Sequence, residues 1–482
     1  MRNIVLTNSL TRRKEPLALL NPDSKHVGIY ACGVTVYDDC HIGHAMQAIY
    51  FDILRSYLKY CGYNVTYVRN YTDVDDKIIN RAREKGISPA KLAAEMIDGS
   101  IRDMAAIGVK PADFEPKVSE NIPEIIAMIE QLIANGYAYS TKSGDVYYRV
   151  RKKSDYGKLS NRKPDELKSG TRDIVAGEKE DELDFALWKN DSTPDASWQS
   201  PWGVGRPGWH IECSAMSCKH LGKSFEIHGG GRDLIFPHHE NEIAQSEAAN
   251  GAQYASIWMH SGLLTIEQQK MSKSLGNHIT IKKFLSEWPA EVLRLGFLMN
   301  HYSSNIDFSQ HFFQTCMKRL LYYYEGLVAM SEYSGDLKAE PDQKLIDEFN
   351  AAMADDLNTV SAISAMNLAF KRARELMSGK KSPQKQQDVA AIFSAIRQTS
   401  DVLGLFKNLP QNEIHSLKTK LLPSLGITED EINAAINERK AARASKDFAK
   451  GDAVRDQMAA KGIELRDSPA GTIWSIKFVG DE

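Results

Sequence analysis

The sequence predicts an α/β protein: a split Rossmann-like nucleotide-binding domain with an insertion, followed by an α-helical bundle and a small C-terminal α/β module. Three observations predict this fold class. A strand–helix–strand pattern spans residues 27–68, strand and helix signals return after about residue 200, and long amphipathic helices dominate after about residue 307. With 482 residues, the chain is also long enough for about three or four ordinary domains.

The first unit is a strand, a helix and a second strand. Residues 27–37 are mostly apolar, β-branched or small, which predicts a buried strand. A helix with apolar residues at helical spacing follows and ends at Gly62, a residue type that commonly terminates helices. Residues 64–68 supply the next strand. Because parallel strands need a crossover helix, this pattern predicts a parallel sheet with its ligand crevice at the carboxyl ends of the strands.

The rest of the chain divides into segments that differ in composition and in predicted secondary structure. Residues 122–200 hold a helix (122–134), a Tyr-rich hairpin (137–150) and a charged stretch, which we interpret as an insertion. Sheet and helix signals resume at 209–216 and 225–228. The predicted domains are the first Rossmann half (1–121), the connective insertion (122–200), the second Rossmann half (201–250), a region with a Lys/Ser loop (251–310), the helical bundle (311–410) and the C-terminal module (411–482).

Composition narrows the class of protein. Hydrophobic residues make up 42% and charged residues 26%, which is typical of a folded globular chain. Six cysteines at irregular spacing do not resemble a disulfide framework, so we expect a reducing, cytoplasmic setting. No apolar run is long enough to cross a bilayer, so we expect no membrane partner. With 60 basic and 63 acidic residues, any nucleic-acid contact must come from a local patch.

Two motifs combine groups that suit phosphate. His41-Ile42-Gly43-His44 lies where the first strand gives way to a helix, so backbone donors, a positive helix end and two imidazoles converge there. Lys270-Met271-Ser272-Lys273-Ser274 pairs two lysines with small polar residues, which suits transient polyphosphate charge. Alone, the first motif is also compatible with two surface histidines and the second with a solvated loop.

In this order and at this separation, the two motifs resemble the signature pair of the class I aminoacyl-tRNA synthetases. The resemblance implies that an amino-acid carboxylate attacks the α-phosphate of ATP, that Mg²⁺-pyrophosphate leaves and that an aminoacyl-adenylate forms. His41, His44, Lys270 and Lys273 would then stabilise the developing charge as catalytic residues. The ATP-binding residues implied are His41, Ile42, Gly43, His44, Gly230, Asp233, Lys270, Met271, Ser272, Lys273 and Ser274. Asp233 taken alone is also compatible with a turn cap.

Four potential metal ligands border the predicted crevice. Cys32 lies towards the end of the first strand, Cys213 lies in a predicted helix, and His238 and Glu242 are four residues apart, on one face of a helix that a proline would open. Two thiolates, an imidazole and a carboxylate suit zinc. The residues are far apart in sequence, and periodicity alone would also permit His239 with another acid.

The sequences around these residues are similar to those of bacterial cysteinyl-tRNA synthetases over nearly the whole chain. This resemblance implies one Zn²⁺ held by Cys32, Cys213, His238 and Glu242, which binds the substrate thiol and so selects cysteine over serine. The implied cysteine pocket consists of Gly33, Thr72, Trp209 and His228. The implied partners are L-cysteine, ATP and tRNA(Cys), and the implied state is a monomer. Trp209 taken alone is also compatible with a core aromatic.

The same resemblance implies a stem-contact role for residues 251–310, anticodon-stem binding by residues 311–410 and anticodon binding by residues 411–482. A basic stripe would form if the first C-terminal helix runs past Ser445, and it consists of Arg439, Arg443, Lys446 and Lys450. Trp474 would stack on an unpaired base. The stripe is also compatible with a solvated helix face and Trp474 with a core role. Asp355-Asp356-Leu357-Asn358-Thr359 resembles part of the family's helical domain and offers no chemistry of its own.

Two other functions stay open at this point. A ligase that joins cysteine to an amino sugar would use the same zinc pocket and adenylate chemistry, but it lacks the anticodon module that residues 417–482 supply. A non-catalytic tRNA-binding paralogue would not need the intact histidines and lysines of the two signature motifs.

Overall fold

The computed structural model describes residues 3–166, 178–266, 269–270, 278–407, 410–468 and 471–476. By its contacts the chain forms two compact units. Unit 1 comprises Met1–Ser286, Phe297–Asp307 and Glu348–Ile363, and unit 2 comprises Glu287–Gly296, Phe308–Asp347 and Ser364–Glu482. The six predicted domains are finer than this division, and their bounds stay predictions.

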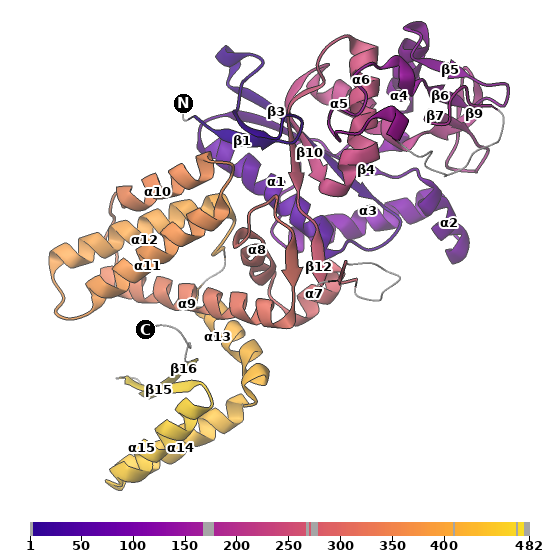
Figure 1. Cartoon of the computed structure of the whole chain (residues 1–482). Coiled ribbons are helices and arrows are strands. Elements are labelled where there is room, and N and C mark those ends of the chain that lie inside the picture. The colour runs from indigo at the N-terminus through magenta and orange to yellow at the C-terminus, as the bar shows by residue number, and fades with distance from the viewer. Residues whose placement is uncertain are drawn as a thin grey trace. The chain divides into compact units, whose positions relative to one another are not determined.

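A parallel sheet in the order β11-β10-β3-β4 forms the centre of unit 1 (Figure 1). Helix α1 (Ile42–Tyr60) joins β3 (His26–Thr35) to β4 (Asn64–Thr72), and β10 (Phe225–Gly231) and β11 (Ala255–Ser261) come later in the chain. Strand β4 follows β3 on one side of the sheet, and β11 follows β10 on the other side. The strand order therefore reverses between β3 and β10. Open α/β sheets bind ligands at the carboxyl ends of the strands at such a point. The predicted Rossmann-like fold is therefore confirmed.

Local sequence explains these elements well. Strand β3 is buried from Val27 to Cys32, as expected of an interior strand with apolar residues on both faces. Helix α1 begins after His41, which caps it, and ends at Tyr60. Gly62 follows with a φ of 84°, a conformation that glycine adopts without steric cost.

One hydrophobic core lies on the side of the sheet that faces α5 (Trp209–Leu221) and α6 (Glu240–Asn250). Tyr30 and Cys32 share this side because side chains two residues apart in a strand point the same way. Ile211, Cys213 and Ile243 contribute to the same cluster. The predicted metal ligands Cys32 and Cys213 thus belong to rigid, buried elements.

The segment after α4 (Ile122–Ala134) forms an antiparallel five-stranded sheet in the order β5-β6-β7-β9-β8. The predicted helix 122–134 and hairpin 137–150 are confirmed as α4 and β5/β6. The sheet consists of β5 (Ala138–Ser140), β6 (Val146–Tyr148), β7 (Phe185–Asn190), β8 (Trp198–Ser200) and β9 (Gly203–Pro207). Unit 1 also holds β1 (Val5–Asn8), β2 (Arg13–Pro16), α2 (Asp76–Lys85), α3 (Pro89–Ala106), β12 (Leu264–Ile266) and β13 (Gln269–Lys270).

Helices dominate the remainder of the chain, as the sequence predicts. They are α7 (Ile281–Glu287), α8 (Ala290–Leu298), α9 (Gln310–Ser334), α10 (Gln343–Ala354), α11 (Thr359–Met377), α12 (Pro383–Leu403) and α13 (Pro410–Leu421), with the short strand β14 (Ile306–Phe308) before α9. Within unit 2, α9 packs against α12 and α13. The last part holds α14 (Glu429–Ala444), α15 (Phe448–Ala460) and an antiparallel pair of strands, β15 (Ile463–Ser468) and β16 (Gly471–Ile476).

The condition for a continuous basic stripe is not met. Helix α14 ends at Ala444, Lys446 takes a left-handed φ of 62°, and α15 starts as a separate helix at Phe448. The basic residues therefore do not share one helix face, because the left-handed residue turns the chain out of the helix.

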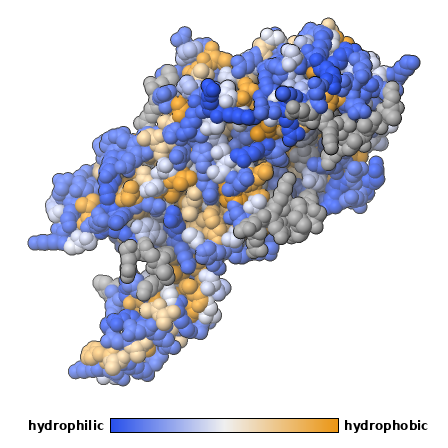
Figure 2. All heavy atoms as spheres, in the orientation of Figure 1, coloured by the Kyte–Doolittle hydropathy of each residue, from blue (hydrophilic) through white to orange (hydrophobic). Residues whose placement is uncertain are grey.

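The surface mixes hydrophilic and hydrophobic residues, as the face in Figure 2 shows. Large apolar side chains that are exposed include Leu20, Ile101, Phe114, Leu368 and Phe448. Single exposed side chains of this kind are ordinary on protein surfaces. Within the described part of the chain, no helix has both the length and the apolar character of a membrane span.

Candidate active site and metal centre

The start of α1 is built by two histidines. The ring Nδ1 of His41 accepts hydrogen bonds from the backbone N–H groups of Gly43 (3.1 Å) and His44 (3.4 Å). In return, the ring Nδ1 of His44 accepts from the backbone N–H of His41 at 3.3 Å. The two rings stack with their centroids 3.6 Å apart. This reciprocal cap fixes both imidazoles at the positive end of the helix.

The cap also fixes the protons of the two rings. An Nδ1 atom that accepts a hydrogen bond from a backbone N–H cannot carry a proton, so each neutral ring carries its proton on Nε2. His41 and His44 can therefore donate hydrogen bonds from Nε2 to an anionic oxygen near the helix terminus. This is the arrangement that the predicted phosphate-binding role of the motif requires.

The segment after the predicted Lys/Ser loop contacts the same start of α1. The backbone N–H of Ile42 donates to Ile279 O at 3.1 Å, and Ile281 donates to Cys40 O at 2.9 Å. The ring of His278 lies edge-on to His41 at 5.0 Å. Lys270 begins the loop at the end of β13, where it pairs with Thr265. The predicted residues Met271, Ser272, Lys273 and Ser274 lie outside the described residues, but the segment that follows them starts beside α1.

The glycine run after β10 packs closely against its surroundings. A Cβ atom on Gly229 would lie 2.0 Å from Met259 O, so only glycine fits there. Gly230 lies next along the strand and pairs with His260 of β11. Asp233 follows in an exposed 3₁₀ turn, where its carboxylate faces solvent. The sequence-predicted ATP residues Gly230 and Asp233 thus lie at the carboxyl end of β10, next to the reversal point of the sheet.

The four predicted metal ligands converge. The side-chain donor atoms of Cys32, Cys213, His238 and Glu242 all lie within 4.8 Å of one another, and all four residues are buried. The Cys32 sulfur is 3.7 Å from the Cys213 sulfur, 3.5 Å from His238 Nε2 and 3.4 Å from Glu242 Oε1. His238 Nε2 lies 2.9 Å from Glu242 Oε1. Residues from β3, α5 and α6 therefore meet at one point beside the sheet.

His238 is not part of the α-helix that holds Glu242. Helix α6 starts at Glu240, and His238 belongs to the π-helical turn Ile235–His239 before it. The four-residue spacing nevertheless brings the two side chains together, because the turn leads directly into the helix. Glu240 points elsewhere and accepts hydrogen bonds from the backbone of Gly157 (2.9 Å) and Ser160 (2.8 Å).

The neighbouring His239 offers a second ligand set. Its Nε2 lies 3.3 Å from the Cys32 sulfur, and a group of Cys32, His228, His239 and Glu242 also satisfies the distances of a metal site. Both His238 and His239 have a partner on the other ring nitrogen, as a metal-binding histidine usually does: His210 lies 2.9 Å from His238, and His260 lies 2.8 Å from His239. The first set differs from the second in its two cysteines, and thiolates suit zinc.

The electrostatics of the cluster suit a soft divalent cation. A hydrogen bond from Cys32 lowers the pKa of Cys213 to about 6, against the effect of burial. Burial disfavours the carboxylate of Glu242, yet His228 and His238 hold its pKa well below the usual range. Burial and the neighbouring Cys213 raise the pKa of Cys32 well above normal. Buried anionic groups of this kind favour a metal ion, and two thiols favour zinc over Mg²⁺.

The predicted cysteine-pocket residues surround this cluster. Gly33 follows Cys32 in β3, and a Cβ atom there would lie 1.6 Å from Asn70 O, so no other residue fits without moving β4. His228 in β10 is buried and bonded to Glu242. Trp209 stacks on His238 at 4.1 Å and keeps 36% of its surface exposed, so it is not a core aromatic.

Thr72 is linked to the cluster by the side chain of Asn70, a residue that the sequence analysis did not identify. The Asn70 side chain accepts from Gly33 N–H at 2.9 Å, and its amide nitrogen lies 3.4 Å from Thr72 Oγ1. Its oxygen is also 3.8 Å from the Cys213 sulfur. An asparagine inside an otherwise buried strand was the available signal. Other missed residues around the site are His210, Glu212 and Tyr254, all of which belong to the cluster's polar surroundings.

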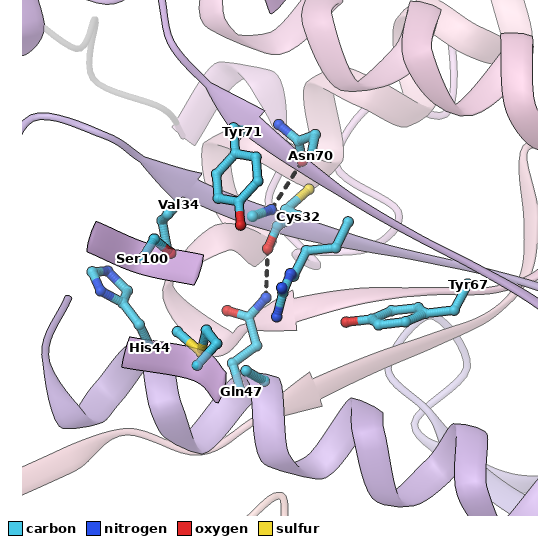
Figure 3. Close-up of a pocket in the computed structure, with 12 residues that line it drawn as sticks. Cys32, Val34, His44, Gln47, Tyr67, Asn70, Tyr71 and Ser100 are labelled. Carbon is cyan, nitrogen blue, oxygen red and sulfur yellow. Dashed lines mark hydrogen bonds between the residues drawn. The ribbon is translucent and has the colours of Figure 1, made fainter. Parts of the chain in front are cut away.

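A pocket lies beside β3, lined by residues of β3, β4, α1 and α3 that include Gly33, His44, Gln47 and Arg69 (Figure 3). Gln47 donates to the carbonyl of Cys32 at 2.5 Å, and Figure 3 shows the Cys32 sulfur pointing away from Gln47. The pocket therefore adjoins the His41–His44 motif, and Cys32 and Asn70 are among the residues that line it.

The predicted tRNA contacts lie in unit 2. Arg439 is buried, and both its terminal nitrogens bond to Asp467, one of them at 2.5 Å. Arg443 also pairs with Asp467, at 2.6 Å. Trp474 is half-buried, and Lys418 Nζ lies 5.3 Å from its ring centroid. Arg439 therefore holds the module together internally, whereas Arg443, Lys446 and Trp474 keep accessible surface.

Comparison with protein families covers most of the chain. Residues 19–318 match the model of the "tRNA synthetases class I (C) catalytic domain", and residues 348–407 match the DALR domain. Among solved structures, methionyl-tRNA synthetase from Mycobacterium tuberculosis in complex with methionyl-adenylate has a TM-score of 0.58 at 15% sequence identity, over 84% of this chain and 95% of that one. At this identity the likeness shows the fold alone.

Relatives of much higher identity exist. A cysteine–tRNA ligase from Syntrophotalea carbinolica is 46% identical over 478 residues, which cover 98% of this chain and 99% of the relative. The cysteine–tRNA ligase of Geobacter metallireducens is 46% identical over 482 residues, with the same coverage of both chains. Together with the fold and the catalytic-domain match, these similarities show that the chain belongs to the cysteine–tRNA ligase family of the class I tRNA synthetases.

Proposed function

We propose that this chain activates L-cysteine with ATP to cysteinyl-adenylate and pyrophosphate, and then transfers cysteine to the 3′ end of tRNA(Cys). The observation that carries this proposal is the convergence of the Cys32, Cys213, His238 and Glu242 donor atoms, with Cys32 on the strand that leads into the His41–His44 cap. A thiol-selective site and a phosphate-binding helix end thus occur at the reversal point of one sheet.

Adenylate formation requires positioning and charge stabilisation more than covalent chemistry. His41 and His44 would donate from Nε2 to oxygens of the ATP phosphates as negative charge develops. Lys270 and Lys273 would neutralise the leaving Mg²⁺-pyrophosphate. Support comes from Ile279, which follows their loop in the sequence and accepts a hydrogen bond from Ile42 of the same helix. Asp233, with Gly230, would bind the ribose of ATP. Ile42, Gly43, Met271, Ser272 and Ser274 would line the nucleotide.

Cysteine selection would use the metal cluster. Zinc held by Cys32, Cys213, His238 and Glu242 would supply a soft coordination position that a thiolate fills and a hydroxyl does not. Gly33 and Thr72, joined by Asn70, would hold the backbone end of the amino acid. Trp209 and His228 would enclose its side chain.

The tRNA would be bound by the helical bundle and the C-terminal module. Support comes from the DALR match and from the accessible residues Arg443, Lys446 and Trp474. We further propose that the enzyme works in the cytoplasm and as a monomer. All six cysteines are free thiols, which supports a reducing compartment.

A charging assay tests the proposed function. With ATP, Mg²⁺ and unfractionated tRNA, we expect cysteine to be attached to tRNA and serine to be attached at a rate lower by about 10⁴ or more, because serine lacks the strong sulfur–metal interaction. The measurement is acid-precipitable radiolabelled amino acid. Cysteine-dependent ATP/pyrophosphate exchange without charging of any tRNA would instead favour a ligase for an amino sugar, and the absence of both would favour a non-catalytic paralogue.

A further inference from the structure

The turn between α10 and α11 contains a buried carboxylate with an unusual number of partners. Asp356 is 4% exposed and has a φ of 61°, and Leu357 after it has a φ of 50°. Asparagine and aspartate tolerate such left-handed conformations, but leucine disfavours them. The surrounding contacts must therefore hold this turn in place.

Asp356 is held first by the N-terminal strand β1, which lies beside this turn (Figure 1). Its Oδ1 accepts from the backbone N–H of Thr7 at 2.7 Å, and its Oδ2 accepts from Thr7 Oγ1 at 2.5 Å. Its own N–H donates to Val5 O at 2.9 Å. The carboxylate thus accepts hydrogen bonds from both the backbone and the side chain of one residue, Thr7 of β1.

The second set of contacts comes from the turn after α8. Tyr302 donates its hydroxyl to Asp356 Oδ1 at 2.6 Å, and His301 Nε2 lies 2.9 Å from the Asp356 carbonyl. From there, His301 contacts Ser303 Oγ at 2.8 Å, and the Ser303 carbonyl accepts a hydrogen bond from Arg232. Arg232 precedes Asp233, the residue proposed to bind the ribose of ATP.

From Thr7, the chain of β1 continues towards the metal side of the site. Two residues after Thr7, Ser9 donates its N–H to Trp258 O at 2.8 Å, and its hydroxyl lies 2.8 Å from His260 Nδ1. His260 in turn contacts His239, next to the proposed ligand His238. Asp356 itself contacts β1 and the 301–303 turn, and several residues separate it from the nucleotide side and from the metal side.

The position of this turn in the chain gives these contacts a role. Residues 348–363 belong to unit 1 by their contacts, while α10 and α11 have their outer parts in unit 2, which includes most of the matched DALR domain. We propose that Asp356 is a positioning residue that fixes the α10–α11 turn to β1 and to the 301–303 turn, so that tRNA bound by the helical bundle is presented correctly to the active site. This inference rests on the proposed tRNA-charging function.

The test compares Asp356→Ala with its neighbour Asp355→Ala in the full-length protein. Asp355 is exposed and its carboxylate pairs with Lys14 at 2.5 Å, so it serves as the matched control. For Asp356→Ala we expect the KM for tRNA to rise about tenfold, while tRNA-independent ATP/pyrophosphate exchange stays within about twofold of wild type. Asp355→Ala should leave both within about twofold.

A third variant separates positioning from folding. Asp356→Asn keeps the shape and the left-handed preference, and the Thr7 hydroxyl can turn to accept from the amide, so this variant should restore the KM for tRNA to within about threefold. If Asp356→Ala does not fold, Thr7→Val removes one of the contacts alone and should show the same split to a smaller degree.

Three results would overturn the inference. One is an unchanged KM for tRNA in Asp356→Ala, another is an equal loss of exchange and charging, and the third is no rescue by Asp356→Asn. Failure of the wild-type protein to charge tRNA would refute the proposed function and this inference with it. Wild-type charging with an unaffected Asp356→Ala would refute the inference alone.

Discussion

Cys213→Ser is expected to lose bound zinc and to lower cysteine-dependent ATP/pyrophosphate exchange by about a thousandfold, because a serine hydroxyl is a poor zinc ligand and the selective interaction with the substrate thiol is lost with the metal. Cys213 is 1% exposed, so the change alters the buried donor set and not the surface. Its sulfur lies 3.7 Å from that of Cys32, within the group of four donors. Zinc per chain, measured by atomic emission on purified protein, is the direct readout.

Cys218 provides the matched control for this change. It lies five residues later in the same helix, half-buried, with its sulfur 4.0 Å from Asn250 Nδ2 and outside the metal cluster. Cys218→Ser should keep a full complement of zinc and an exchange rate close to that of the wild type. Equal, tightly bound zinc in the wild type and in Cys213→Ser would contradict the assignment of the ligands.

His44→Ala is expected to lower kcat for cysteinyl-adenylate formation by about 10² to 10³, with little change in the KM for cysteine. The reason is that the Nε2–H donor of His44 acts on charge that is present mainly in the transition state. His44 also caps α1 through Nδ1, which accepts from His41 N–H at 3.3 Å. The rate must therefore be measured together with the melting temperature.

Two substitutions that introduce a side-chain amide separate the capping role of His44 from its proposed catalytic role. His44→Asn can place an oxygen where Nδ1 accepts from the backbone, so it should keep the cap and remain slow. His44→Gln can place an amide N–H nearer to Nε2 and should recover part of the rate. His26→Ala is the control for the loss of a histidine, because His26 lies at the end of β3 that is away from α1 and contacts Thr66 at 2.9 Å. A rate for His44→Asn equal to that of the wild type would refute the catalytic role.

Local patterns predicted the elements of this fold where the signal was strong. Helix α4 starts and ends at the predicted residues, because its apolar periodicity and its proline after Ile122 are both local. The sequence left open whether the helix of residues 429–445 continues past Ser445. In the structure Lys446 takes a left-handed φ, and α14 and α15 pack against each other as separate helices.

The candidate site likewise has one part that local sequence predicts and one part that depends on tertiary contacts. The His41–His44 cap is a property of one short segment, and its position at a strand–helix junction could be read from the sequence. The metal cluster joins residues up to 210 positions apart in the chain, so their convergence followed from the family resemblance and not from spacing. Asn70 and His210 went unnoticed because their roles depend on tertiary contacts: Asn70 joins Gly33 to Thr72, and His210 contacts the second nitrogen of His238.

The central claim is that the metal cluster selects cysteine by its sulfur. Its most direct test is the absorption spectrum of the enzyme with Co²⁺ in place of zinc, recorded with L-cysteine, with L-serine and with no amino acid. We expect L-cysteine to add a sulfur-to-cobalt charge-transfer band, and L-serine to leave the spectrum as it is without amino acid, since its hydroxyl stays protonated. A spectrum with L-cysteine that is identical to that with L-serine would contradict the account.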